Sequence, residues 1–197
     1  MRDHYTPFDI GNRFTVVPAT NVPVEENRIP LVMDRGAFGS GEHETTQSCL
    51  EILETLPAKD KLRILDLGSG TGILTIATLL LNSGHAWCID IEQCAVDSGK
   101  RNSEYNGVDE SITHICGTLD HLQENNFNLI LANIYGDILL DVAEDLVNKA
   151  ESGALLLLSG ILWEYNFDVR QKYQQLGCQL IQNRLLDEFS TILLKKL

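Results

Sequence analysis

The chain has 197 residues, of which 44% are hydrophobic and 22% charged, a composition that suits one globular domain with a sizeable core. Its apolar runs stay short of the roughly 18 residues of a membrane span and its start lacks a signal-peptide core, so we expect a cytoplasmic protein with no membrane partner. The net charge of −13 argues against direct nucleic-acid binding and fits either a basic protein partner or simple solubility.

The N-terminal part, residues 1–44, is predicted to be an arm followed by a loop, because prolines interrupt it and its hydrophobic periodicity is poor. Residues 14–17 suggest a short edge strand within this arm. Strand and helix patterns then alternate through residues 45–197, which predicts a separate α/β domain.

A helix is expected over residues 45–56, preceded by a stretch rich in glycine and serine. It opens with Thr45 and Thr46, residue types that cap helices. Free backbone N–H groups at such a start suit a bound carboxylate. A capped helix without any ligand explains the same residues equally well.

The most informative segment is an apolar strand over 63–67 that ends in three alternating glycines, Gly68, Gly70 and Gly72, before a helix over 71–82. Glycine is favoured in such a turn because the backbone adopts φ values that a Cβ resists, and because it lets a ligand approach closely. A glycine turn between a buried strand and a helix is typical of nucleotide-like cofactor sites in open α/β sheets.

A second strand, over 86–90, ends in Asp90, about 20 residues beyond the first glycine, as expected for a carboxylate that binds two ribose hydroxyls. The helix that follows is predicted over 93–106, where Asn106 and Gly107 give a C-terminal capping signal. The turn and the acid together predict a cofactor site.

The spacing of the glycines distinguishes between the kinds of cofactor that such a turn can bind. A dinucleotide fingerprint requires a third glycine where this chain has Ile73 or Thr75, depending on the first glycine counted. No Gly-Lys-Ser/Thr ending follows, which excludes a P-loop. An NAD-binding domain therefore remains only a weaker alternative.

The rest of the chain continues the α/β alternation and then ends in two strands without a helix between them, which predicts an antiparallel hairpin at a sheet edge. In chain order the expected elements are strands 112–116 and 127–132, helix 136–149, strand 154–158, helix 163–176, and strands 178–181 and 189–194.

Asn133 follows the strand over 127–132, at the edge of the sheet where ligands bind. Its amide offers a fixed donor and acceptor beside a reacting group, or it caps the next helix. The five cysteines are scattered without a Cys-x-x-Cys pair, so we expect reduced thiols and no metal site.

The run Asp66-x-Gly68-x-Gly70-x-Gly72 resembles the first motif of the S-adenosylmethionine-dependent methyltransferases. The order of motifs along nearly the whole chain resembles, more closely, the ribosomal protein L11 methyltransferases. The motifs that carry this resemblance are Asp34-x-Gly36-x-Phe38-Gly39-x-Gly41-x-His43-x-Thr45-Thr46, the glycine turn, Ile89-Asp90-Ile91, Ala132-Asn133-Ile134 and Leu158-Ser159-Gly160-Ile161-Leu162.

This resemblance implies a class I methyltransferase fold, a Rossmann-like α/β sheet of seven strands with helices on both faces and the last strand antiparallel. It implies S-adenosyl-L-methionine as the cofactor of a methyltransferase domain over 45–197, with residues 1–44 as an arm and a loop that covers the cofactor. It also implies methyl transfer to a lysine side chain or an N-terminal amine of a basic protein, including a ribosomal protein.

The family's cofactor-binding positions fall on Thr46, Gly68, Asp90 and Asn133. We expect Asp90 to hold the ribose and the glycine turn to hold the methionine part of the cofactor. Asn133 is also the candidate catalytic residue, which would orient the acceptor amine.

Three further residues complete the predicted site. Asp66 is expected to hold the turn and the cofactor's amino group, and Leu119 to line the adenine. His43 is a candidate base or substrate contact, or else a structural residue.

Two departures from the family leave the substrate open. Family members carry an N-terminal domain that recognises the ribosomal protein, and we expect this chain to be the catalytic domain without it. The family's Thr-His-Pro-Thr-Thr is Glu42-His43-Glu44-Thr45-Thr46 here. A methyltransferase of a small amine or of another basic protein, and a non-catalytic cofactor-binding partner, therefore remain alternatives.

Overall fold

A computed structural model describes residues 6–19, 27–34 and 41–197. Its main sheet has seven strands in the order β6-β5-β4-β7-β8-β10-β9, and a second sheet has three in the order β1-β2-β3. The strands are β1 Phe8–Ile10, β2 Phe14–Pro18, β3 Ile29–Met33, β4 Leu62–Leu67, β5 Gly84–Asp90, β6 Ile112–Cys116, β7 Phe127–Asn133, β8 Ala150–Leu162, β9 Cys178–Leu185 and β10 Phe189–Lys196.

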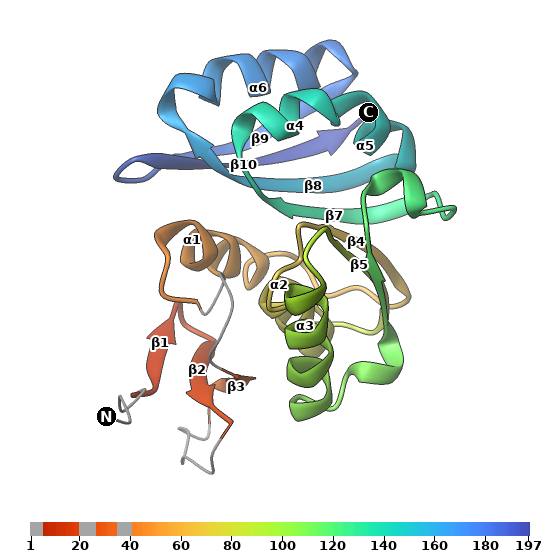
Figure 1. Cartoon of the computed structure of the whole chain (residues 1–197). Helices are drawn as coiled ribbons and strands as arrows, with labels where there is room; N and C mark the ends of the chain where they lie inside the picture. The colour runs from red at the N-terminus through yellow and green to blue at the C-terminus, as the bar shows by residue number, and fades with distance from the viewer. Residues whose placement is uncertain (1–5, 20–26, 35–40) are drawn as a thin grey trace.

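The helices pack on both faces of the main sheet (Figure 1). One apolar cluster joins α1 and α2 to the sheet, and a second joins α4, α5 and α6 to its other face. The α-helices are α1 Glu44–Leu53, α2 Ile73–Leu81, α3 Gln93–Tyr105, α4 Gly136–Asp141, α5 Ala143–Lys149 and α6 Trp163–Gln175, with short 3-10 helices η1 Asp109–Ser111 and η2 Leu119–His121.

The topology confirms the predicted fold. Strands β4, β5, β6, β7 and β8 pair in parallel, while β10 lies between β8 and β9 and is antiparallel to both. Parallel strands place their carboxyl ends at one edge, so the turn after β4, the acid after β5 and the asparagine at the end of β7 reach the same rim.

Two sequence expectations were wrong. Residues 14–17 belong to β2, which is the central strand of the three-stranded sheet and not an edge strand, because the short β1 and β3 flank it on both sides. The helix expected over 136–149 is two helices, α4 and α5, separated at Val142.

The three-stranded sheet packs into the same apolar cluster as α1 and α2. Its contribution comes from Ile10, Phe14, Val16, Leu31 and Met33, all of which are buried. Glu54 at the end of α1 accepts hydrogen bonds from the backbone N–H groups of Asn12 and Arg13, so the turn between β1 and β2 is also held by a charged group. The division of the chain at residue 44 stays a prediction.

Candidate functional site

The glycine turn between β4 and α2 has left-handed backbone at its three glycines: φ is +69° at Gly68, +53° at Gly70 and +77° at Gly72. Side chains with a Cβ rarely adopt these values, which explains the residue type at each position. The N–H of Gly68 donates to the carbonyl of Ile89 at 2.8 Å, which ties the turn to the end of β5.

Asp90 lies against this turn. Its Oδ2 accepts the N–H of Gly70 at 2.8 Å and its Oδ1 accepts the N–H of Glu92 at 3.0 Å. The side chain is half-buried, and an ionised carboxylate has about four acceptor positions, so capacity remains for further donors. The structure therefore brings together the turn and the acid that the sequence singled out.

Asp66 lies beneath the turn and is 2% exposed. The hydroxyl of Thr75, in α2, donates to Asp66 Oδ2 at 2.7 Å and accepts the thiol of Cys88 at 3.3 Å. Burial raises the pKa of Asp66 to about 7; the hydrogen bond from Thr75 opposes that shift and the charge of Asp90 adds to it. Asp66 thus holds the start of α2 through its hydrogen bond with Thr75. Contact between Asp66 and a cofactor amino group remains a prediction.

This buried acid predicts a pH dependence of stability. Because the folded pKa of Asp66 is about 7 and its ordinary value is 3.8, the folded chain holds more protons than the unfolded chain between these values. Its contribution to stability should therefore fall as the pH rises through this window and level off above it. Urea unfolding across the window should show this slope, and Asp66→Asn should flatten it; parallel curves for the two proteins would contradict the assignment.

Thr46 and Asn133 are 87 residues apart in the chain and meet at the rim, where Asn133 Nδ2 donates to Thr46 Oγ1 at 3.3 Å. Thr46 is buried and Asn133 half-buried. Asn133 does not cap α4, whose N-cap is Tyr135. Two of the predicted site residues are thus neighbours across the start of α1 and the end of β7.

The cap of α1 differs from the expectation. The side chain of His43 accepts the N–H of Thr45 at 3.3 Å, and both threonines lie inside the first turn of the helix. The ring of His43 also packs edge-on against Phe189, with 5.2 Å between ring centroids. These contacts give His43 a structural role, and its function as a base stays a prediction. Residues 36–40 of the same motif lie outside the described residues.

The segment after Asn133 packs closely against two glycines. A Cβ at Gly68 would collide with the side chain of Ile134, and a Cβ at Gly160 would lie 2.7 Å from the Ile134 carbonyl oxygen. The N–H of Ile134 donates to the carbonyl of Ser159 at 3.0 Å. The glycine turn, Asn133 and the end of β8 are therefore held in mutual contact.

Sequence reasoning missed the role of Asn102, which is fully buried in α3. Its Nδ2 donates to the carbonyl of Thr71 in the glycine turn at 2.9 Å, and its Oδ1 accepts the N–H of Asp34 at 2.7 Å. One turn later, Asn106 bonds both backbone groups of Val32. The available signal was two asparagines at helical spacing on the buried face of an amphipathic helix.

Leu119 lies in η2, just after β6, and is 5% exposed. It packs in one apolar cluster with Leu67 and Ile89, the residues that end β4 and β5 before the turn and Asp90. The N–H of Gly117 donates to the backbone carbonyl of Asp90 at 2.8 Å. Leu119 is therefore near Asp90, and contact with an adenine ring stays a prediction.

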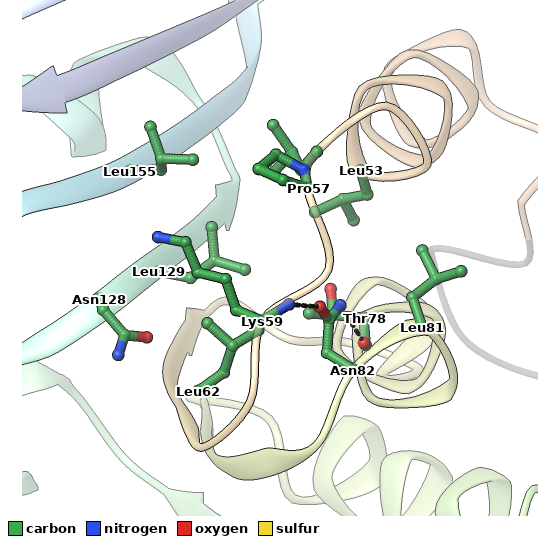
Figure 2. Close-up of a pocket in the computed structure, with 11 residues that line it drawn as sticks. Leu53, Pro57, Lys59, Leu62, Thr78, Leu81, Asn82, Asn128, Leu129 and Leu155 are labelled. Carbon is green, nitrogen blue, oxygen red and sulfur yellow. Dashed lines mark hydrogen bonds between the residues drawn. The ribbon is translucent and has the colours of Figure 1, made fainter.

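A small pocket lies at the opposite edge of the sheet, near the amino ends of β4 and β7 (Figure 2). Leu53, Leu62, Leu129 and Leu155 form much of its wall, and the N–H of Lys59 donates to Asn82 Oδ1 at its side. Its volume of about 30 Å³ holds a few water molecules at most. None of the predicted site residues lines this pocket, so it is not part of the candidate site.

Two features are absent from the residues that the structure describes. In this part of the chain, no three His, Cys, Asp or Glu side chains gather to bind a metal. No helix in it has the length and apolar character to cross a bilayer.

The strand order, the antiparallel last strand and the glycine turn at the carboxyl rim define a class I methyltransferase fold. A family model described as ribosomal protein L11 methyltransferase (PrmA) matches residues 1–197. The chain belongs to this family.

Individual proteins agree with the family assignment. A ribosomal protein L11 methyltransferase of Staphylococcus epidermidis is 33% identical over 183 residues, which cover 91% of this chain and 58% of that protein. One of Campylobacter jejuni subsp. doylei is 40% identical over 159 residues, which cover 81% and 54%. The chain thus spans a little over half the length of these relatives.

A solved structure shares nearly the whole architecture. The crystal structure of a ribosomal protein L11 methylase from Lactobacillus delbrueckii subsp. bulgaricus superposes with a TM-score of 0.88 at 26% identity. The superposition covers 98% of this chain and 100% of that one.

Proposed function

We propose that this chain transfers a methyl group from S-adenosylmethionine to an amino group of ribosomal protein L11, either a lysine side chain or the N-terminal amine. The observation that carries the proposal is the meeting of Thr46 and Asn133 at the rim that also holds the glycine turn and Asp90. Membership of the family and the names of its relatives support the same substrate. A cytoplasmic location fits this substrate.

The residues at the rim fit the cofactor. Asp90 has spare acceptor positions for two ribose hydroxyls. No side chain caps α2, whose N-cap is Gly72, so its first N–H groups are suited to the carboxylate of the methionine part. Leu119 is buried with the apolar ends of β4 and β5, and its small accessible edge would contact the adenine. The cofactor supplies a methyl group on a positively charged sulfur, already activated for transfer.

The acceptor amine must lose its proton before it attacks. A free lysine has a pKa near 10.4, so its neutral form costs about 4–5 kcal/mol at pH 7. An ammonium held beside a positive sulfur and shielded from water has a lowered pKa, because both effects disfavour its charge. The chain then needs no dedicated base, and Asn133 has only to hold the nitrogen in line with the methyl group.

Asn133→Ala should lower kcat by about tenfold or more while weakening cofactor affinity much less, because it removes the group that orients the acceptor. Thr46→Val is a companion variant, because it removes the hydroxyl that accepts the hydrogen bond from Asn133. Thr46 is itself a predicted cofactor contact, so this variant should lower cofactor affinity more than kcat. Single-turnover rates and calorimetric titration with the cofactor separate the two effects. A loss confined to cofactor affinity would make Asn133 a cofactor ligand only.

The proposed function is tested by incubating the chain with purified ribosomal protein L11 and isotopically labelled S-adenosylmethionine. Label in L11, and an intact mass increased by whole methyl groups, is the expected result. Label in small molecules or in other basic proteins of a lysate would point to the alternative acceptors. Cofactor binding without any labelled product would instead identify a non-catalytic partner.

A further inference from the structure

Three large apolar side chains lie exposed where α6 begins over the hairpin of β9 and β10. Trp163, Phe167 and Leu185 are 55%, 61% and 65% exposed. Trp163 and Phe167 are four residues apart on α6 and therefore share one side of the helix. We call these three side chains the rim patch.

Hydrogen bonds place Leu185 on the same side as α6. Asn166 Nδ2 donates to Ser190 Oγ at 2.8 Å, so Ser190 faces α6. Leu185 pairs directly with Ser190 across the hairpin, and paired residues point to the same side of a sheet. The indole N–H of Trp163 donates to the carbonyl of Phe189 at 3.0 Å. This hydrogen bond holds Trp163 against the same end of the hairpin.

The rim patch and the proposed active site lie at the same carboxyl rim of the sheet. Phe189, which binds Trp163 through its carbonyl, packs its ring against His43, three residues before Thr46. Trp163 follows directly on β8, which pairs in parallel with β7 beside Asn133. A segment bound on the patch would therefore lie at the same rim of the sheet as an amine held at Asn133.

Carboxylates surround the rim patch. Glu164 and Asp168 are exposed on α6, and Asp187 and Glu188 are exposed in the hairpin turn. The guanidinium of Arg170 lies 6.0 Å from the Phe167 ring. Arg184 is paired with Glu51 at 2.8 Å. The local charge is thus negative around an apolar centre.

We propose that the rim patch docks a basic segment of the methyl-accepting protein, with apolar side chains on the patch and lysine or arginine toward the flanking carboxylates. Exposed aromatic groups surrounded by polar residues are typical of binding surfaces, and charge complementarity directs the choice of partner. The proposal rests on the proposed function, because it takes the partner to be ribosomal protein L11.

The double variant Phe167→Ser with Leu185→Ser tests the docking surface without touching the hydrogen bond of Trp163. Its dissociation constant for fluorescently labelled L11, and its KM for L11, should rise by about tenfold, while kcat and the affinity for S-adenosylmethionine stay unchanged. Tyr105→Ser is the matched control, because Tyr105 is an aromatic residue 48% exposed at the end of α3. Glu164→Gln with Asp168→Asn should weaken L11 binding and reduce its salt dependence.

Each result decides between the two proposals. If the double variant binds L11 with unchanged affinity and unchanged KM, the docking surface is wrong. Methylation of L11 by the unmodified chain would still support the proposed function in that case. Binding of L11 that the double variant loses, without methylation, would uphold the surface and overturn the function. If the unmodified chain neither binds nor methylates L11, both proposals fall. A dimer that the double variant dissociates, with L11 binding unchanged, would assign the patch to a second copy of this chain.

Discussion

Asp90→Ala should weaken the binding of S-adenosylmethionine by at least about tenfold, which corresponds to 1.4 kcal/mol or more. The substitution removes the proposed partner of both ribose hydroxyls. It also removes the acceptor for the N–H groups of Gly70 and Glu92, so the glycine turn loses a fixed point. Hydrogen bonds to a charged group contribute about 1.5–3 kcal/mol each, which makes this one of the largest single effects expected in the site.

Calorimetric titration with the cofactor measures this effect directly. Asp97→Ala is a suitable control, because Asp97 is an exposed acid on α3 that accepts a hydrogen bond from the side-chain amide of Gln93. Asp90→Asn retains one acceptor and should give an intermediate affinity. Affinity that stays unchanged in Asp90→Ala would remove the ribose assignment.

Gly160→Ala should destabilise the fold and abolish most methyl transfer. The new Cβ would lie 2.7 Å from the carbonyl oxygen and 3.0 Å from the carbonyl carbon of Ile134, and a backbone contact is not relieved by rotating a side chain. The residue also has a φ of +77°, where a side chain costs about 1–2 kcal/mol. We expect a total loss of about 3 kcal/mol or more, together with displacement of Asn133.

The same strand offers a control for the backbone conformation. Gly153 has a φ of +84°, and a Cβ there would meet nothing within 4 Å. Gly153→Ala should therefore cost only the conformational strain of about 1–2 kcal/mol and leave kcat unchanged. Denaturant midpoints and initial rates for the two variants separate the clash from the strain. Equal losses of stability and of methylation rate in the two variants would show that the contact with Ile134 does not contribute.

Much of the main sheet was predictable because its central strands, β4 and β7, are buried on both faces and read as continuous apolar runs. Strands β4, β6 and β7 were located within a residue at each end, and the absence of a helix between the last two strands correctly gave an antiparallel hairpin. The fold class followed from this order, because few topologies accommodate it.

The rest of the fold lacked a local signal. Strands β1 and β3 are only three and five residues long, and Pro30 interrupts any alternation in β3. They are held by pairing with β2 and by side-chain hydrogen bonds, from Arg28 to the carbonyl of Phe14 and from the N–H of Val32 to Asn106. Helices α4 and α5 share an apolar periodicity, so the break at Val142 was invisible to a pattern of period 3.6.

The candidate site was also predictable only in part. The glycine turn and Asp90 were recognisable because their spacing along the chain reflects one strand, turn and helix. The contact between Thr46 and Asn133, and the bridge that Asn102 makes between Thr71 and Asp34, join segments that only the folded chain brings together.

The small N-terminal sheet shares its apolar cluster with α1 and α2, and Asn102 links its last strand to the glycine turn. Two parts that bury one continuous core are expected to unfold cooperatively, in a single transition. Local unfolding of that sheet would then break the hydrogen bond from Asp34 to Asn102 and weaken the support of the glycine turn. Stability gained in the first third of the chain should accordingly be measurable as tighter cofactor binding at the rim.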